Sequence, residues 1–392
     1  MKILRIIPSM DPKRGGPCQG IRNAIPEMLK HGIYNEVVCF DEPTAGYLNQ
    51  DTFAIHTLGN GKTPWKYNGE LMPWLLNHFK NYDIVVVHGL WQYHTYAAIK
   101  AISKYRKMNS EVPAIYVMPH GMLDPYFQQA KERRAKALRN TIFWRLFENN
   151  VVNRADGVLF TCEEELLLAR TTFPNYQPKK EINVGYGIQP PPSRIAEMRE
   201  AFAHTVPQWN GKPYLLFLSR IHPKKGVDLL IRSYLRLEKE MEGLPQLIIA
   251  GPENHEYGKA MQALAAASPN ILFSGMLSGD AKWGAFYESE AFVLPSHQEN
   301  FGIAVVEALA CKKPVLISNK VNIWREIEKG GGGIVQNDTE HETLDLLKKW
   351  LSLPLDKKKD MAGKAYIVYQ DYFTIAQAAK QFIKGIQNNS VE

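Results

Sequence analysis

The sequence predicts an α/β fold with parallel sheets, divided between two domains. Short β-branched or aliphatic runs alternate with longer amphipathic segments along almost the whole chain, which is the pattern of successive βαβ units. The chain has 392 residues, too many for one ordinary core, so two domains are expected. The strongest break in the pattern is the glycine- and proline-rich segment Gly185-Tyr-Gly-Ile-Gln-Pro-Pro-Pro-Ser193. A new series of strands and helices follows it. We therefore place a domain boundary there.

The apolar runs locate the individual elements. The expected strands are Lys2–Ile7, Glu36–Phe40, Ile84–His88, Ala114–Met118, Gly157–Thr161, Tyr214–Ser219, Gln246–Ala250, Ile271–Ser274, Ala291–Leu294 and Val315–Ser318. Helical periodicity lies between them, for example over Ile21–His31, Leu71–Lys80 and Val227–Lys239. The last segment, from Tyr369 to about Gln387, is predicted to be a helix that packs back across the domain boundary.

Composition indicates a globular cytoplasmic protein. Hydrophobic residues make up 45% of the chain and charged residues 22%, and no apolar run reaches the roughly 18–20 residues that span a bilayer. The N-terminus reads as a first strand and not as a signal peptide. The 4 cysteines are scattered, which fits reduced thiols and argues against a zinc site or a disulfide framework. The net charge of +7 suits anionic lipid, nucleotides or nucleic acid without choosing among them.

Two acidic residues flank the start of a predicted helix in the second half of the chain. In Pro295-Ser-His-Gln-Glu299-Asn-Phe-Gly302-Ile-Ala-Val-Val-Glu307, an Asn-Phe-Gly turn opens an apolar, helix-like run that has a strand on either side. The helix should begin near Gly302, and its free N–H groups suit a phosphate at the ligand-binding edge of the sheet. Two carboxylates beside an anion need other partners, and sugar hydroxyls are the obvious ones. The stretch therefore predicts a sugar-phosphate site.

A basic loop follows the first strand of the second half. Phe217-Leu-Ser-Arg220-Ile-His-Pro-Lys-Lys225-Gly226 brings Arg220 and Lys225 to the C-terminal edge of the sheet. Arg grips phosphate oxygens through its fork and Lys adds a mobile point charge, so the loop predicts more of the phosphate site. The alternative is a solvated basic loop. For Lys224 that alternative is favoured, because adjacent lysines cannot both point into one cleft.

Three loops of the first half can each be interpreted as functional or as purely structural. The Gly15-Gly16 pair after the first strand lets backbone approach a phosphate or forms an ordinary turn, and it is neither a GxGxxG nor a Walker motif. His120 lies in a Pro-His-Gly loop just beyond a strand end and is either structural or functional. Trp91 and His94 could contact an acceptor sugar, although packing in the core is the favoured interpretation.

A basic stretch with aromatic residues occupies residues 131–147. Lys131-Glu-Arg133-Arg134-Ala-Lys136-Ala-Leu-Arg139 runs into an Ile-Phe-Trp-Arg-Leu-Phe segment that ends at Phe147. This pattern suits an interfacial helix on an anionic membrane, at the inner face if the protein is cytoplasmic. It equally suits a helix with one solvated and one buried face, which is the commoner outcome for a charge run.

All of these pieces, taken in order, resemble the retaining GT-B glycosyltransferases of the family 4 group. The resemblance covers nearly the whole chain, through the loop at Gly16, the turn at His120, the Val184-Gly-Tyr-Gly-Ile segment, the basic loop and the Glu299–Glu307 stretch. It implies two Rossmann-like domains that face a central cleft. Residues 1–187 would bind the acceptor, residues 188–370 would bind the nucleotide sugar, and residues 371–392 would form a helix that returns to the first domain.

The resemblance also implies the roles of individual residues. Arg220 and Lys225 would hold the diphosphate of the donor, and the Gly16 amide would approach it from the other domain. Glu307 would bind the ribose hydroxyls. Glu299 would contact the hydroxyls of the sugar ring, and His120 would contact the donor sugar near its C6 hydroxyl or the reaction centre. The implied catalytic residues are His120, Arg220, Lys225 and Glu299.

Further donor contacts are implied from two loops. The amides of Asn300, Phe301 and Gly302, with Ile303, would support the sugar or the phosphate, and the backbone around Met276 and Leu277 would recognise the base. A departing nucleoside diphosphate carries negative charge, which a helix start with Arg and Lys stabilises without a metal. No Asp-x-Asp pair occurs to hold a metal, so neither a metal nor a cofactor is expected.

The sequence thus predicts a metal-independent, retaining glycosyltransferase of polysaccharide biosynthesis. It would move a hexose from a nucleoside-diphosphate sugar to a saccharide or lipid-linked acceptor, with a UDP-hexose such as UDP-glucose as the preferred donor and GDP-mannose as the alternative. No nucleic-acid partner is expected. One rival is a nicotinamide-dependent dehydrogenase, which the missing GxGxxG disfavours. A second is a non-catalytic carbohydrate- or nucleic-acid-binding protein.

Overall fold

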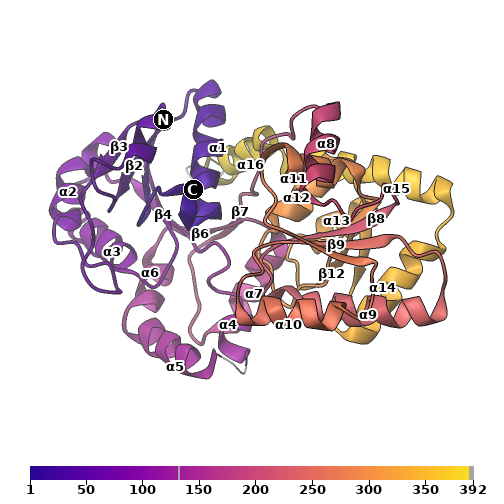
Figure 1. The fold of residues 1–392 in the computed structure, drawn as a ribbon. Coiled ribbons are helices and arrows are strands. Elements are labelled where there is room, and N and C mark those ends of the chain that lie inside the picture. Colours follow the sequence, from indigo (N-terminus) through magenta and orange to yellow (C-terminus); the bar gives the residue numbers. More distant parts are fainter. Residues whose placement is uncertain (131–132, 388–392) are drawn as a thin grey trace. The chain divides into compact units, whose positions relative to one another are not determined.

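The computed structural model describes residues 1–130 and 133–387, which form two compact α/β units. Unit 1 comprises Met1–Gly187 together with the chain from Ile375 onward, and unit 2 comprises Ile188–Thr374. In each unit a parallel sheet lies between helices on its two faces (Figure 1). This three-layer arrangement is what alternating strands and helices produce.

Unit 1 is built on a seven-stranded sheet in the order β3-β2-β1-β4-β5-β6-β7 within the described residues. Its strands are β1 Lys2–Ile6, β2 Tyr34–Cys39, β3 Ile55–Thr57, β4 Ile84–His88, β5 Ala114–Met118, β6 Gly157–Phe160 and β7 Glu181–Asn183. Its helices are α1 Gly16–Lys30, α2 Leu71–His78, α3 Tyr93–Tyr105, α4 Tyr126–Gln129, α5 Arg134–Phe143, α6 Asn149–Arg154, α7 Glu163–Thr172 and α16 Ile375–Gln387. The strand order reverses between β1 and β4, which marks the point where open α/β sheets bind ligands.

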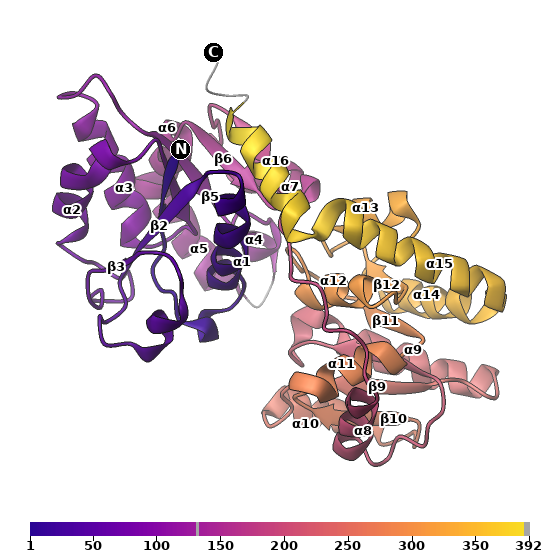
Figure 2. The same ribbon diagram turned by 90° about the horizontal axis from the view of Figure 1, so that it is seen from above.

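The two faces of this sheet have separate cores. Alternation along β1 sends Leu4 into a cluster with α2 and α3, and sends Ile3 into a cluster with α1 and α16. On the second face Met28 of α1 and Phe382 of α16 are both buried in that cluster. Helices α1 and α16, far apart in the sequence, therefore pack on the same face of the sheet (Figure 2).

The C-terminal helical segment is not the continuous helix expected from Tyr369. A π-helical turn at Tyr369–Phe373 ends at Thr374, whose backbone is extended with φ −73° and ψ 151°, and α16 begins only at Ile375. Residues 371–373 of the expected helix therefore belong to unit 2. Residues 388–392 of that expectation lie outside the described residues. No glycine or proline stands between Tyr369 and Ile375, so the sequence carries no breaker that would reveal the break.

Unit 2 is built on a six-stranded sheet in the order β10-β9-β8-β11-β12-β13 within the described residues. Its strands are β8 Tyr214–Leu218, β9 Gln246–Ala250, β10 Ile271–Gly275, β11 Ala291–Leu294, β12 Val315–Ser318 and β13 Gly333–Gln336. Its helices are α8 Ala196–Thr205, α9 Val227–Glu240, α10 Glu256–Ala265, α11 Gly279–Glu288, α12 Ile303–Ala310, α13 Trp324–Gly330, α14 Glu340–Ser352 and α15 Leu355–Val368. The order reverses between β8 and β11, which pair in parallel.

Three strands were not expected from the sequence. They are β3, β7 and β13, each of three or four residues, and each lies at an edge of its sheet. Every residue of these strands is only partly buried, whereas the central strands are almost entirely buried. Short edge strands lack the continuous apolar run that identifies a buried parallel strand.

Candidate active site

Buried Lys225 and partly buried Glu299 form an ion pair at the reversal point of the unit 2 sheet. Lys225 ends a 3-10 turn, Pro223–Lys225, in the loop after β8, and Glu299 lies in the loop after β11. The Lys225 Nζ donates to Glu299 Oε2, and Lys225 is only 3% exposed. Burial would raise the pKa of Glu299, but the positive charges of Lys225, and then of Lys224 and Arg220, outweigh it and lower the pKa. The carboxylate is therefore held ionised.

The backbone conformation and the limited space at position 226 explain why a glycine follows the two lysines. Its φ of 65° is left-handed, and a Cβ at this position would lie 2.0 Å from the carbonyl oxygen of Pro295. The loop after β8 is thus pressed against the end of β11. Ser296 Oγ donates to the Lys224 carbonyl at 2.9 Å, which ties the two loops together. These contacts set the positions from which Lys225 and Glu299 meet.

Arg220 has a different character from Lys225. It lies two residues after the end of β8 and its side chain is exposed. The described residues give it no hydrogen bond or ion pair, so its guanidinium fork is available to a ligand. The structure therefore places both predicted phosphate-binding side chains at the same strand end, one preorganised in an ion pair and one free.

Helix α12 begins beside this ion pair, as predicted. Gly302 is its N-cap, with φ 75° and no side chain to cap the first amides. A Cβ on Gly302 would lie 3.2 Å from Glu299 Cγ, so the helix start and the acid are in direct contact. Phe301 is buried and Ile303 is 37% exposed. The side chain of Asn300 accepts a hydrogen bond from Asn322 Nδ2 at 3.4 Å.

Glu307 lies one turn further along α12 and has a partner that sequence reasoning missed. Lys282 of α11 donates to Glu307 Oε1 at 2.6 Å. Burial raises the pKa of Glu307, and the Lys282 ammonium opposes this rise. No sequence signal predicts this pair, because Lys282 lies on a different helix with no motif around it. A ribose that binds Glu307 would have to share this carboxylate with Lys282.

The loop proposed to recognise the base follows β10. Gly275 ends the strand with φ 66°, Met276 is 75% exposed and Leu277 is buried. Since β10 lies two strands from β8 in a parallel sheet, this loop emerges at the same edge as Arg220. The anchored Leu277 side chain would hold the Met276 backbone in place.

Gly16 and His120 belong to unit 1. Gly16 is the first residue of α1, and its carbonyl accepts a hydrogen bond from the Tyr186 hydroxyl at 2.7 Å. A Cβ on Gly20, one turn later, would lie 2.5 Å from the Tyr186 ring. The Gly-Tyr-Gly segment that closes the first half therefore packs on the first turn of α1 and fixes the glycine loop.

His120 is the end of a buried hydrogen-bond chain that sequence reasoning missed. Its Nε2 lies 2.9 Å from His88 Nδ1, and Arg5 Nη1 lies 3.2 Å from His88 Nε2. Arginine has only donors, so neutral His88 carries its proton on Nδ1 and donates to His120 Nε2. Neutral His120 then carries its own proton on Nδ1. Burial, followed by the charge of Arg5, lowers the pKa of His120 to about 4.

Positions along the strands account for this chain. Arg5 is on β1, His88 ends β4, and both point to the face covered by α1 and α16. His120 follows β5 with a φ of 53°, which is rare for a residue other than glycine. Arg5 is 3% exposed and has no carboxylate partner among the described residues; it also donates to Asn35 Oδ1 at 2.9 Å. The alternation of side chains along β1 and β4 was the sequence signal that could have placed Arg5 and His88 on the same face of the sheet.

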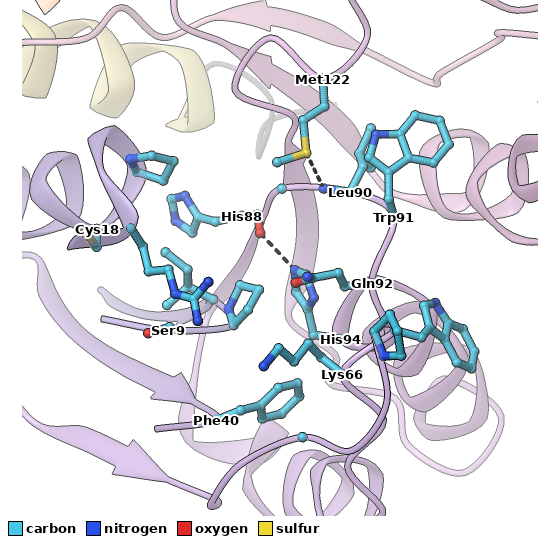
Figure 3. A pocket seen from close by; sticks show the side chains of 18 of the residues that line it. Ser9, Cys18, Phe40, Lys66, His88, Leu90, Trp91, Gln92, His94 and Met122 are labelled. Carbon is cyan, nitrogen blue, oxygen red and sulfur yellow. Dashed lines mark hydrogen bonds between the residues drawn. The ribbon is translucent and has the colours of Figure 1, made fainter. Parts of the chain in front are cut away.

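Unit 1 also contains a cavity of about 510 Å³ at the reversal point of its sheet (Figure 3). The loops after β1, β2, β3 and β4 line it, together with the start of α1, Met122 and part of α5. Trp91 and His94, for which core packing was the favoured interpretation, both line this cavity, although His94 is fully buried. His94 Nε2 lies 2.8 Å from the His88 carbonyl oxygen, as Figure 3 shows.

The basic stretch after residue 130 forms α5 and a π-helical turn, Trp144–Glu148; Lys131 and Glu132 lie outside the described residues. Leu138, Ile142 and Leu146, four residues apart in sequence, are 65%, 49% and 61% exposed.

None of the helices in the described parts of the chain combines the length and apolarity needed to cross a bilayer. Within residues 1–130 and 133–387 no group of three or more His, Cys, Asp or Glu is placed to hold a metal ion.

Unit 2 is similar in sequence to known proteins. Residues 200–368 match the family model described as glycosyl transferases group 1. Sulfoquinovosyl transferase SQD2 of Arabidopsis thaliana is 28% identical over 179 residues, which are 45% of this chain and 32% of that protein. Trehalose synthase of Rubrobacter xylanophilus is 31% identical over 189 residues, 45% of each protein. The chain thus spans less than half the length of these relatives.

Comparison of structures extends the likeness to both units. Anabaena Alr3699/HepE, solved in complex with UDP and glucose, matches with a TM-score of 0.70 at 17% identity, over 99% of this chain and 100% of that one. At this identity the likeness concerns the fold alone. The two parallel sheets are those of the GT-B fold, and residues 200–368 are similar to the glycosyl transferases group 1 family.

Proposed function

We propose that the protein is a glycosyltransferase that moves a hexose from a nucleoside-diphosphate sugar to a saccharide or lipid-linked acceptor in polysaccharide biosynthesis. The observation that carries this proposal is the Lys225–Glu299 ion pair beside the uncapped start of α12, at the reversal point of a sheet whose sequence matches the glycosyl transferases group 1 model. Exposed Arg220 emerges at the same strand end. Together these groups offer fixed positive charge for a diphosphate and an ionised carboxylate for sugar hydroxyls.

The chemistry follows from where charge develops. As the bond between the anomeric carbon and the phosphate oxygen breaks, negative charge grows on the departing diphosphate. Arg220, Lys225 and the first amides of α12 would stabilise that charge in place of a metal. The acceptor hydroxyl would attack the anomeric carbon from the same face and give its proton to a leaving phosphate oxygen. The anomeric configuration is then retained without an enzymic nucleophile.

The carboxylates have binding roles in this scheme. Glu299 is already held by Lys225, so its remaining lone pairs would accept hydrogen bonds from the sugar ring. Glu307 would accept from the ribose hydroxyls. From unit 1, the Gly16 amide would approach the diphosphate, and His120 would present its Nδ1–H to an oxygen of the donor sugar.

UDP-glucose is the preferred donor and GDP-mannose the alternative. The UDP and glucose in the HepE structure support the first choice only by likeness of fold. Contacts from the backbone of Met276 and Leu277 would read the base, and Asn300, Phe301 and Ile303 would line the sugar side of the site. A protein that binds nucleotides or carbohydrates without transfer is the less favoured candidate.

Contact with an anionic membrane is a further part of the proposal. Leu138, Ile142 and Leu146 give the helical segment an exposed apolar stripe, and exposed Arg134 and Arg145 are cationic. Such a stripe with basic neighbours suits the interface of an anionic bilayer. Flotation with phosphatidylglycerol vesicles tests it: the wild type should float, and a triple Leu138→Gln, Ile142→Gln, Leu146→Gln variant should not. Equal recovery of both proteins would contradict the contact.

Arg220 provides the cleanest test of the donor site, because its side chain has no structural partner among the described residues. Thermal shift is measured with UDP, GDP and NAD, followed by hydrolysis of UDP-glucose and GDP-mannose with and without EDTA. UDP or GDP should raise the melting temperature, EDTA should change nothing, and Arg220→Ala should abolish both the shift and hydrolysis. Arg232→Ala, which removes an exposed arginine on α9, is the matched control. No shift with either nucleoside diphosphate would overturn the proposed function.

A further inference from the structure

We propose that the cavity of unit 1 binds an acceptor saccharide that carries an anionic group, a phosphate or a carboxylate. This inference rests on the proposed glycosyl transfer and adds the chemical class of the acceptor. It is carried by the charges, the unsatisfied polar atoms and the aromatic walls of the cavity, all of which belong to unit 1.

The lining of the cavity has an excess of positive charge. Arg14, Lys66 and Arg139 line it from three separate segments. Within the described residues the side chains of Arg14 and Lys66 have no hydrogen bond or ion pair, and Arg139 donates only to Asn140 Oδ1, at 3.1 Å. Asp41 is the acidic residue of the described lining. Three cations against one carboxylate favour an anionic ligand.

Asp41 does not neutralise these cations, because its oxygens are engaged elsewhere. One oxygen accepts from Ser9 Oγ at 2.6 Å and the other accepts from the Met10 amide, also at 2.6 Å. These bonds hold the loops after β1 and β2 together, since Asp41 follows β2 and Ser9 follows β1. The Asp41 carboxylate therefore holds the two loops together and leaves the positive charge of the lining in excess.

His94 supplies a polar atom that the fold leaves unsatisfied. The imidazole is fully buried, and its Nε2 lies 2.8 Å from the His88 carbonyl oxygen, so Nε2 carries the proton. Nδ1 has no partner among the described residues. An unpaired buried acceptor is costly, and a sugar hydroxyl in the cavity would satisfy it. The Nε1–H of Trp65, another lining residue, is a buried donor without a partner in the same part of the chain.

Aromatic walls fit the apolar faces of a sugar ring. Phe40, Trp91 and Phe143 line the cavity from the loops after β2 and β4 and from α5 (Figure 3 labels the first two). Trp91 has a φ of 72°, which is unusual for a bulky residue, and its amide donates to Glu148 Oε1 at 2.9 Å. Aromatic rings with a few placed polar groups and cations are a typical lining for a charged saccharide.

Binding of matched saccharides to the full chain tests the proposal. Titration calorimetry in the presence of UDP compares glucuronate and glucose 6-phosphate with neutral glucose. The wild type should bind at least one anionic probe roughly tenfold or more tightly than glucose, a difference of about 1.4 kcal/mol. Arg14→Gln and Lys66→Gln should each remove that advantage. Lys13→Gln and Lys62→Gln, which remove exposed neighbouring cations that do not line the cavity, should leave it unchanged.

The same anion could be carried by a soluble saccharide or by a lipid-linked one, because α5 both lines the cavity and carries part of the exposed apolar stripe. Vesicles that contain a polyprenyl phosphate distinguish the sources. A soluble source predicts binding of the free sugar acids, whereas a lipid source predicts binding of these vesicles that falls in Arg14→Gln while binding to phosphatidylglycerol vesicles persists.

Three outcomes would overturn the inference. They are measurable binding of glucose that equals binding of the anionic probes, full anionic binding by Arg14→Gln and Lys66→Gln, and no binding of any probe or polyprenyl phosphate vesicle to a folded protein. The UDP thermal shift in unit 2 is followed in every sample. Loss of that shift in the wild type would instead count against the proposed function, so the two failures are distinguishable.

Discussion

His88 Nδ1 lies 2.9 Å from His120 Nε2, and this contact fixes which nitrogen His120 can present to a ligand. Arg5 occupies the other nitrogen of His88 at 3.2 Å. His120 is therefore oriented as a neutral donor through Nδ1, and burial keeps it neutral well below physiological pH. We treat Arg5 and His88 as positioning residues for His120.

Substitution of His88 should affect transfer through His120. His88→Leu removes the donor to His120 and should lower kcat about 100-fold with little change in KM, since misorientation of a contacting group costs about that factor. His88→Asn keeps an amide near the Nδ1 position and should recover most of the loss. Steady-state kinetics provide the measurement, and the ring nitrogens of His120 can be followed by NMR. Unchanged kcat in a folded His88→Leu variant would contradict the positioning role of His88.

The Lys225–Glu299 pair of unit 2 predicts a stability effect with a diagnostic rescue. Lys225→Met leaves Glu299 unpaired and should destabilise unit 2 by about 3 kcal/mol. Lys225→Met combined with Glu299→Gln should regain most of this free energy of unfolding while remaining inactive. Urea denaturation of the single and double variants gives the comparison. If the two losses of stability simply add, the two groups are not coupled as the structure indicates.

Lys282 should control the pH dependence of donor binding. Its ammonium opposes the burial that raises the pKa of Glu307. Lys282→Met should raise that pKa further, so the pH below which UDP affinity declines should move upward. Calorimetric titration of UDP across a pH series tests this shift, with Lys259→Met, the loss of a lysine on α10, as control. Coincident profiles for wild type and Lys282→Met would argue that Glu307 does not bind the ribose.

Glu148 makes stability depend on pH in unit 1. Burial raises its pKa to about 8, against the opposing hydrogen bonds from the Trp91 amide and Thr95. Between the ordinary carboxyl pKa of about 4.5 and about 8, only the folded state holds this proton. Stability should therefore fall as pH rises through this window, by up to about 1.4 kcal/mol per pH unit from this group.

The variant Glu148→Gln isolates that contribution. The amide keeps the shape and the acceptor for Trp91 and Thr95 but does not titrate. Its free energy of unfolding should decline less than that of the wild type between pH 5 and pH 8, in roughly the amount given above. Parallel pH curves for the two proteins would show that Glu148 is ionised in the folded state.

Local sequence was enough for most of the fold and for the helix start beside the predicted donor site of unit 2. The strands Ile84–His88, Ala114–Met118, Gln246–Ala250, Ala291–Leu294 and Val315–Ser318 coincide with their predictions, because buried parallel strands are short, continuous apolar runs. The helix start at Gly302 was also read correctly, since the turn and the apolar run are contiguous in the chain. The half-buried edge strands were missed because this signal fades at the edge of a sheet.

Sequence by itself therefore determined the two parallel α/β units and which loops carry the predicted phosphate- and sugar-binding side chains, because strand order and motif lie along the chain. Only the tertiary structure decided the partners of these groups. Glu299 is paired with Lys225, and Glu307 is paired with Lys282. His120 is hydrogen-bonded to His88, which is in turn hydrogen-bonded to Arg5. Each of these partners lies on a separate element. Such contacts depend on sheet register and on which face a residue occupies, and they set the charge and tautomer of the groups that the sequence had only named.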